Sequence, residues 1–131
     1  MRLGAPVFSE YETPRQWAES VRQKGYAAAL CPLAAGASIT EIRSYEEAAL
    51  AYDIVIAEVG VWNNPLHPDP AEKKKALSHC CSKLQLADEI GARCCVNIAG
   101  SKDPERWDGP HPDNFTEDTF DEIVAAVRHI I

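Results

Sequence analysis

The sequence alternates short apolar segments with helical segments four times over. The apolar segments span residues 3–8, 27–31, 54–59 and 93–98. Runs of this length, flanked by turn residues and followed by segments of helical periodicity, are typical of parallel strands that are covered on both faces. The sequence therefore predicts an α/β fold of four strand-helix units with parallel strands and outer helices.

Capping residues predict where the helices begin and end. Thr13, Ser38, Asp69 and Thr116 are N-cap residues, and the first helix is predicted from about residue 14 to 24. Glycines follow the first and third helices at Gly25 and Gly91. The apolar stripes predicted to be buried are Leu77, Cys80, Cys81, Leu84 and Ala87 in the third helix, and Phe120, Ile123, Val124 and Val127 in the fourth.

The connections are short after each helix and grow longer after the strands. The loops at residues 60–69 and 99–115 are the longest. In parallel α/β folds, ligands bind at the carboxyl ends of the strands. We therefore expect a site built from these two loops together with residues 9–12 and 31–38.

Charge and apolar content exclude several classes of protein. The formal net charge of −7 argues against nucleic-acid binding, and the basic run at residues 73–75 reads as a solvated helix face. No apolar stretch approaches the roughly 18 to 20 residues of a membrane span, so a cytoplasmic location is expected. The five cysteines include no CxxC motif, which favours free core thiols over a metal site.

Known nucleotide-binding motifs are missing from the sequence. Neither GxGxxG nor GxxxxGK[ST] occurs, which argues against a dinucleotide-binding or P-loop protein. A phosphoacceptor receiver domain would need acidic residues at the ends of the first and third strands. Glu10, Glu12 and Glu58 imitate that pattern only loosely.

Two polar residues interrupt the ends of predicted strands. Glu58 is the one charge inside the third apolar run, where it must reach either a solvated site or a basic partner. Asn97 has the matching position on the fourth strand, where its amide can bind a sugar hydroxyl or order the next loop.

Aromatic and histidine side chains stand in the two longest loops. Trp62 and Trp107 can cover the apolar face of a sugar or fill the top of a barrel. His67 and His111 lie in proline-flanked loops, which can present an imidazole at little entropic cost. Loop packing is the favoured interpretation for His67, and both interpretations stay open for His111.

Three segments resemble a known superfamily: residues 56–66 (IAEVGVWNNPL), 87–93 (ADEIGAR) and 97–101 (NIAGS). They look like the amino-terminal half of a sugar phosphate isomerase/epimerase of the xylose-isomerase-like TIM-barrel superfamily. The resemblance implies the first four βα units of a (β/α)8 barrel and a metal-dependent proton transfer between adjacent sugar carbons. It also implies a divalent metal bound by Glu, Asp, His and Glu in the second half of the barrel.

The implied metal ligands lie beyond the matching segments, so the resemblance identifies no catalytic or metal-binding residue here. It leaves substrate shaping to this chain, and the substrate-binding candidates are Glu58, Trp62, Asn97 and His111. We therefore expect the chain alone to be inactive as an enzyme and to bind a small carbohydrate.

An open four-stranded sheet exposes two strand edges and one apolar face. The expectation is a single half-barrel domain over residues 1–131 that belongs to a longer barrel. The alternatives are a homodimer or a sheet rearranged with helices on both faces. The competing functional hypothesis is a noncatalytic sugar-binding or assembly module that works as an associated half-barrel.

Overall fold

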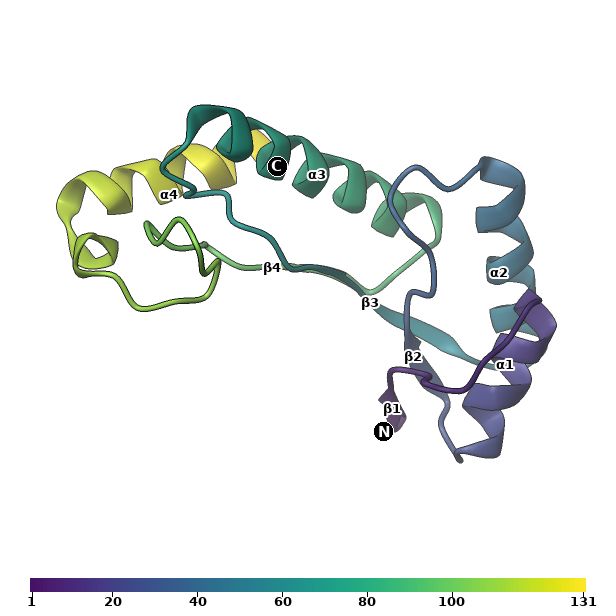
Figure 1. The fold of residues 1–131 in the computed structure, drawn as a ribbon. Helices are drawn as coiled ribbons and strands as arrows, with labels where there is room; N and C mark the ends of the chain where they lie inside the picture. The colour runs from purple at the N-terminus through teal and green to yellow at the C-terminus, as the bar shows by residue number, and fades with distance from the viewer. The chain divides into compact units, whose positions relative to one another are not determined.

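The computed structural model describes all 131 residues and contains four strands and four α-helices in strict alternation (Figure 1). The four strands form one sheet in the order β1-β2-β3-β4, with β2 parallel to both of its neighbours. The predicted α/β fold is therefore confirmed. The elements are β1 (Gly4–Ala5), α1 (Pro14–Gln23), β2 (Ala28–Leu30), α2 (Ile39–Ala51), β3 (Val55–Val61), α3 (Pro70–Glu89), β4 (Cys94–Asn97), the 3₁₀ helix η1 (Pro112–Phe115) and α4 (Glu117–Ile130).

The chain forms two compact units. The first unit comprises residues 1–60 and 85–96, and the second comprises residues 61–84 and 97–131. Neither unit contains a helix long and apolar enough to cross a membrane.

An apolar core holds the first unit together. Helix α1 packs against α2, and Trp17 of α1 meets Tyr45 of α2 edge to face at 5.6 Å between ring centroids. Edge-to-face ring pairs stabilise a fold beyond the effect of burying the two rings. The buried cluster consists of Trp17, Ala18, Val21, Ala29, Leu33, Ile42, Ala49, Ile54, Ile56, Val59, Leu86, Ala87 and Ile90.

The predicted N-caps are confirmed, with one shift. The hydroxyls of Thr13, Ser38 and Thr116 each accept a hydrogen bond from the backbone N–H three residues later. A capping box would also have the Gln16 side chain accept from the N–H of the N-cap Thr13, but in α1 Gln16 Oε1 accepts from the N–H of Glu12 at 2.8 Å, one residue earlier. Local sequence therefore determines where the helices begin.

The first strand is shorter than predicted. Residues 3–8 were expected to be extended, but β1 contains only Gly4 and Ala5. Pro6 follows directly and has no N–H to continue a strand ladder. Leu3 and Phe8 are exposed at 67% and 91%.

The stripe predicted for the last helix holds only in part, with Ile123 and Val124 half-buried. Phe120 and Val127 are exposed at 61% and 47%, whereas Thr119 and Ala126 are buried. An ion pair turns the other face of α4 inward, since Glu122 of α4 binds Lys73 of α3 at 2.6 Å. The α3 stripe holds in part, because Cys80 and Ala87 are buried while Leu77, Cys81 and Leu84 are half-buried.

Candidate functional site

The two longest loops follow β3 and β4, and both lie in the second unit. We call residues 62–69 the β3 loop and residues 98–116 the β4 loop. The carboxyl ends of parallel strands are where α/β folds place their ligands. The contacts between these two loops therefore define the candidate site.

Asn64 joins the two loops through a buried amide. Its Oδ1 accepts from the backbone N–H of Ser101 at 2.8 Å and of Leu66 at 3.2 Å. Its Nδ2 donates to the carbonyl of Ser101 at 2.8 Å and, at 3.4 Å, to that of Asp103. A side chain on Gly100, whose φ is +95°, would overlap Asn64 Oδ1. Asn64 thus replaces the strand-like pairing that two loops cannot make for themselves.

Ser101 and Asn114 extend the network across the β4 loop. The Ser101 hydroxyl is buried and donates to the carbonyl of Gly109 at 2.7 Å. Asn114 accepts from the N–H of Lys102 at 2.8 Å and donates to the same Gly109 carbonyl at 3.2 Å. A long loop with so few apolar residues is therefore held by hydrogen bonds.

Both ring nitrogens of His67 are used inside the protein. Nδ1 accepts from the N–H of Asp69 at 3.0 Å, and Nε2 lies 3.2 Å from the carbonyl of Pro104. With Nδ1 as acceptor, the neutral ring carries its proton on Nε2 and donates it to that carbonyl. The loop-packing interpretation of His67 matches these contacts.

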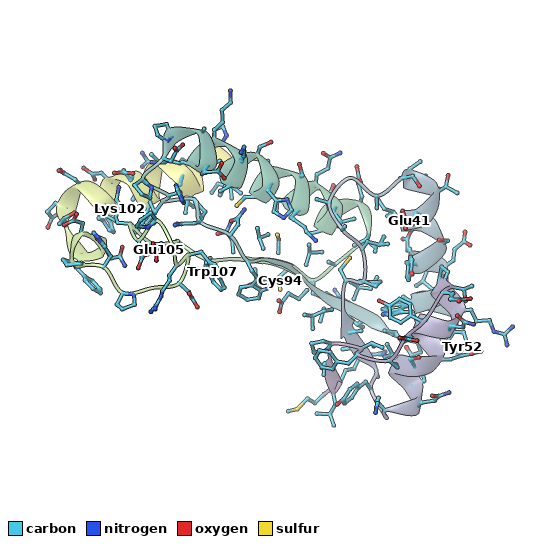
Figure 2. All side chains as sticks on the ribbon, viewed as in Figure 1. Glu41, Tyr52, Cys94, Lys102, Glu105 and Trp107 are labelled. Carbon is cyan, nitrogen blue, oxygen red and sulfur yellow. The ribbon has the colours of Figure 1, made fainter.

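Trp62 and Trp107 meet across the two loops. Their ring centroids are 6.4 Å apart and their planes are inclined by 48°. The two side chains are exposed at 55% and 40%, so they do not fill a core. Figure 2 shows Trp107 on the β4 loop with Lys102 and Glu105. The pair offers an aromatic surface to solvent.

His111 begins the 3₁₀ helix η1. Its Nδ1 accepts from the N–H of Asp113 at 3.3 Å, which caps the helix. The only other contact of the ring is a 3.9 Å approach of the same Nδ1 to the Asp113 carboxylate. A role in substrate binding stays a prediction.

Asn97 is tied to α3 by a relay of donors. Its Nδ2 donates to Cys80 Sγ at 3.0 Å, and that thiol donates to Asn63 Oδ1 at 3.4 Å. Asn63 in turn donates to the carbonyl of Ala76 at 2.9 Å. Burial raises the pKa of the Cys80 thiol, which keeps it a donor. The Asn97 amide group is thereby fixed, and its role in substrate binding stays a prediction.

Glu122 of α4 anchors the base of the β4 loop. It binds the ammonium groups of Lys102, on that loop, and of Lys73, on α3. Hydrogen bonds from these two lysines hold the pKa of the Glu122 carboxyl below its usual value. Lys102 is therefore a structural cation here and is not free to bind a phosphate.

Glu58 lies in the first unit, so the candidate residues fall into two groups. Trp62, Asn97 and His111 share the second unit, and Glu58 is half-buried on β3. The Glu58 carboxylate makes no hydrogen bond or ion pair within the protein. The salt bridge considered from the sequence is therefore not formed, and a role of Glu58 in substrate binding stays a prediction.

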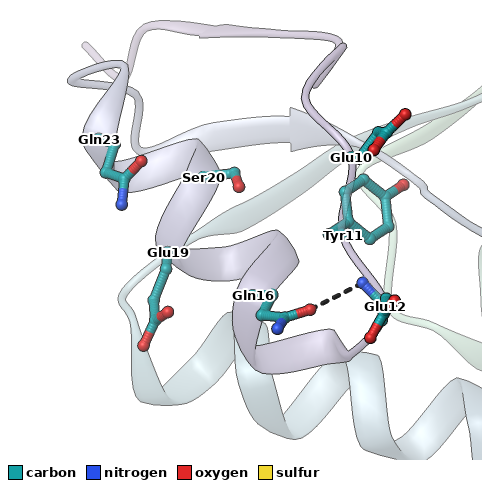
Figure 3. A pocket seen from close by; sticks show the side chains of 7 residues that line it. All are labelled: Glu10, Tyr11, Glu12, Gln16, Glu19, Ser20 and Gln23. Atoms are coloured by element: carbon teal, nitrogen blue, oxygen red, sulfur yellow. Dashed lines mark hydrogen bonds between the residues drawn. The ribbon is translucent and has the colours of Figure 1, made fainter.

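The first unit also contains an acidic hollow of about 600 Å³ beside α1 (Figure 3). Glu19 in its wall is already paired with Arg15 at 2.8 Å and accepts the Tyr52 hydroxyl at 2.9 Å. The lining has no free cation to receive an anion. It consists of Glu10, Tyr11, Glu12, Gln16, Glu19, Ser20 and Gln23.

A divalent metal does not fit the residues of this chain. No three side chains of His, Cys, Asp or Glu converge in the structure. Zinc sites hold the ion with three or four such side chains, and calcium sites use six to eight oxygen ligands. We therefore assign no metal-binding residue among these 131.

Comparison with known proteins identifies the fold. No protein-family model matches the chain, and no curated protein sequence matches it. Among solved structures, it is similar to the D-psicose 3-epimerase of Clostridium cellulolyticum H10, crystallised with D-tagatose, with a TM-score of 0.65 and 16% identity.

The similarity covers 99% of this chain and 47% of the epimerase chain. The chain thus spans about half the length of the protein that it matches. Its four parallel strands with helices correspond to a fragment of the TIM barrel of that epimerase.

Proposed function

We propose that this chain supplies the first four βα units of a sugar isomerase/epimerase barrel and shapes the substrate site there. The observation that carries the proposal is the similarity of 99% of the chain to about half of a D-psicose 3-epimerase. Active sites of such barrels lie at the carboxyl ends of the strands. The β3 and β4 loops stand at that end in this chain.

The chemistry of the two loops suits a sugar. Trp62 and Trp107 give an exposed aromatic surface for the C–H face of a sugar ring. Asn97 and His111 supply polar groups of the kind that bind hydroxyls. The formal net charge of −7, with Lys102 engaged by Glu122, favours a neutral sugar over a sugar phosphate.

The proposed reaction is proton transfer between adjacent carbons of a ketose in the completed barrel, with a divalent metal supplied by the other half. None of the residues described here is assigned to moving that proton. Their proposed task is to bind and orient the sugar, since correct placement by itself lowers the barrier to reaction.

The test has two arms. The longest natural polypeptide containing this sequence is assayed for epimerisation of D-tagatose with Mg²⁺, Mn²⁺ or Co²⁺, and metal-dependent turnover is expected. The 131-residue chain is titrated with D-tagatose while Trp fluorescence is followed, and saturable quenching without turnover is expected. Inactivity of the long polypeptide across ketoses and metals, together with no binding by the chain, would contradict the proposal.

A second candidate function is a noncatalytic sugar-binding or assembly module. The observation in its favour is the exposed apolar surface of Phe115, Phe120 and Val127 beside α4. Size-exclusion chromatography with light scattering distinguishes the two functions. A stable dimer that binds D-tagatose, and a long polypeptide without turnover, would favour the module.

A further inference from the structure

The pairing of β2 with β3 contains one extra residue. Ala29 is paired with Ile56, and the next residue of β2, Leu30, is paired with Glu58. Ala57 therefore has no partner in β2 and forms a β-bulge. Bulges are rare between parallel strands, and they often stand beside functional sites, where they re-aim a side chain.

The bulge decides which face of the sheet carries Glu58. Ile54 and Ile56 point into the core, so strict alternation would place Glu58 there and turn Val59 away. In the structure Val59 is fully buried in the same core as Ile56. The alternation therefore restarts after Ala57, and Glu58 lies on the opposite face, which we call the open face of the sheet.

A thiol on the neighbouring strand holds the bulge. Cys94 of β4 is exposed, and its Sγ donates a hydrogen bond to the carbonyl of Ala57 at 3.4 Å (Cys94 is labelled in Figure 2). The regular ladder resumes on both sides, where Arg93 N–H donates to the Ile56 carbonyl and Cys31 N–H to the Glu58 carbonyl. Cys94 thus contacts the carbonyl of the bulge residue itself.

The surroundings of Glu58 indicate what it binds. Its carboxylate has no partner in the protein, and the residue paired with it on β2 is the half-buried Leu30. A half-exposed carboxylate beside apolar surface keeps water on part of its surface, and a ligand that donates hydrogen bonds can replace that water. Two neighbouring hydroxyls of a sugar can donate to its two oxygens, while Leu30 contacts the C–H groups between them. A phosphate would instead be repelled.

We propose that Glu58 is a hydroxyl-binding carboxylate on the open face of the sheet, aimed there by the Ala57 bulge, with Cys94 as a positioning residue. The ligand group is a neutral vicinal diol, as in an unphosphorylated sugar. This inference rests on the proposed function and assigns one contact within it.

The test measures D-tagatose affinity by titration calorimetry on the 131-residue chain. Glu58→Gln keeps the size and removes the charge, and we expect roughly tenfold weaker binding because charge-assisted hydrogen bonds are lost. Glu47→Gln, an exposed carboxylate change on α2, is the matched control and leaves affinity unchanged. Deletion of Ala57 makes Ile56, Glu58 and Val59 alternate without a bulge, so the carboxylate stays on the open face opposite Leu30 and affinity should stay close to that of the wild type.

A second pair of variants tests whether Cys94 positions Glu58. This test does not depend on the folding of the Ala57 deletion. Cys94→Ala removes the donor to Ala57 and weakens binding, whereas Cys94→Ser keeps a donor and restores it. Wild-type affinity in Glu58→Gln overturns the inference while the proposed function stands. Wild-type affinity in Cys94→Ala overturns the role of Cys94. Absence of binding by the wild-type chain refutes the proposed function, and this inference with it.

Discussion

The two units of this chain are stabilised in different ways. The first unit buries an apolar cluster in which Trp17, Ile42 and Ile90 are almost fully covered. The buried polar residues, Asn64, Ser101 and Thr119, all lie in the second unit. Apolar burial is non-directional, whereas a buried amide must meet each partner with correct geometry. The structure of the first unit thus follows from the apolar pattern of its sequence, whereas that of the second unit depends on individual hydrogen bonds.

The largest effect is expected in the core of the first unit. Trp17→Ala should lower the free energy of unfolding by about 3 to 5 kcal/mol, because it leaves a cavity beside Tyr45. Urea denaturation measures the loss, and Trp17→Phe, which fills part of the space, should cost less. Trp62→Ala, on an exposed ring, is the control. Equal losses for the two tryptophans would remove the distinction between the units.

The next effect tests whether hydrogen bonds hold the second unit. Asn64→Ala should lower the free energy of unfolding by about 2 to 3 kcal/mol, since it leaves buried backbone groups of Ser101 unpaired. Hydrogen exchange should speed up at the Ser101 and Leu66 amides and stay unchanged in α1. Asn97→Ala, which removes one bond to sulfur, is the matched control. Unchanged exchange at Ser101 would show that Asn64 does not join the loops.

A smaller effect is expected from the ion pairs of Glu122. Because the pKa of this carboxyl is lowered in the folded state, its stabilisation is present above the unfolded pKa, about 4.3, and is lost as pH falls through the folded value. The half-exposed pairs should contribute no more than about 1 kcal/mol. Between pH 6 and pH 3, the free energy of unfolding should fall less steeply with falling pH in Glu122→Gln than in Glu117→Gln. An equal pH dependence of the free energy of unfolding in the two variants would contradict a stabilising role of the Glu122 ion pairs.

The smallest effect is expected on the outer face of α4. Phe120→Ser should change stability by within about 0.5 kcal/mol, because this side chain is 61% exposed. Thr119→Ala, one residue away but buried, should cost more. The measurement is thermal unfolding of both variants at equal protein concentration. A large loss for Phe120→Ser would show that this face of α4 is covered in solution.

The sequence predicted the fold from strong, local signals. Hydrophobic runs gave four strands, and Thr13, Ser38 and Thr116 were identified as caps because a capping bond joins residues three apart. The first strand is shorter than its apolar run because Pro6 cannot donate to the strand ladder. Only part of the α4 stripe is covered, because apolar residues show which face of a helix can be buried and a neighbouring element decides whether it is.

The candidate site was predicted less well than the fold. The sequence placed Trp62 and Trp107 in long loops, either against a sugar or filling the top of a barrel, but their meeting depends on contacts between residues 45 positions apart. Asn64 was missed as a key residue, although Asn before Pro65 and the glycine at position 100 were signals of a tight loop. The role of Asn64 requires Ser101 to lie opposite it in space, and no local sequence pattern predicts that.

By itself, the sequence determined the alternation of strands and helices, the helix starts and the polar character of the loops, because each depends on residues close together in the chain. Only the tertiary structure decided that Glu58 faces away from the core, that Asn64 joins the two loops and that Phe120 stays exposed. These outcomes depend on strand register and on packing between distant segments. A single extra residue in a strand reverses a face without changing the hydrophobic pattern.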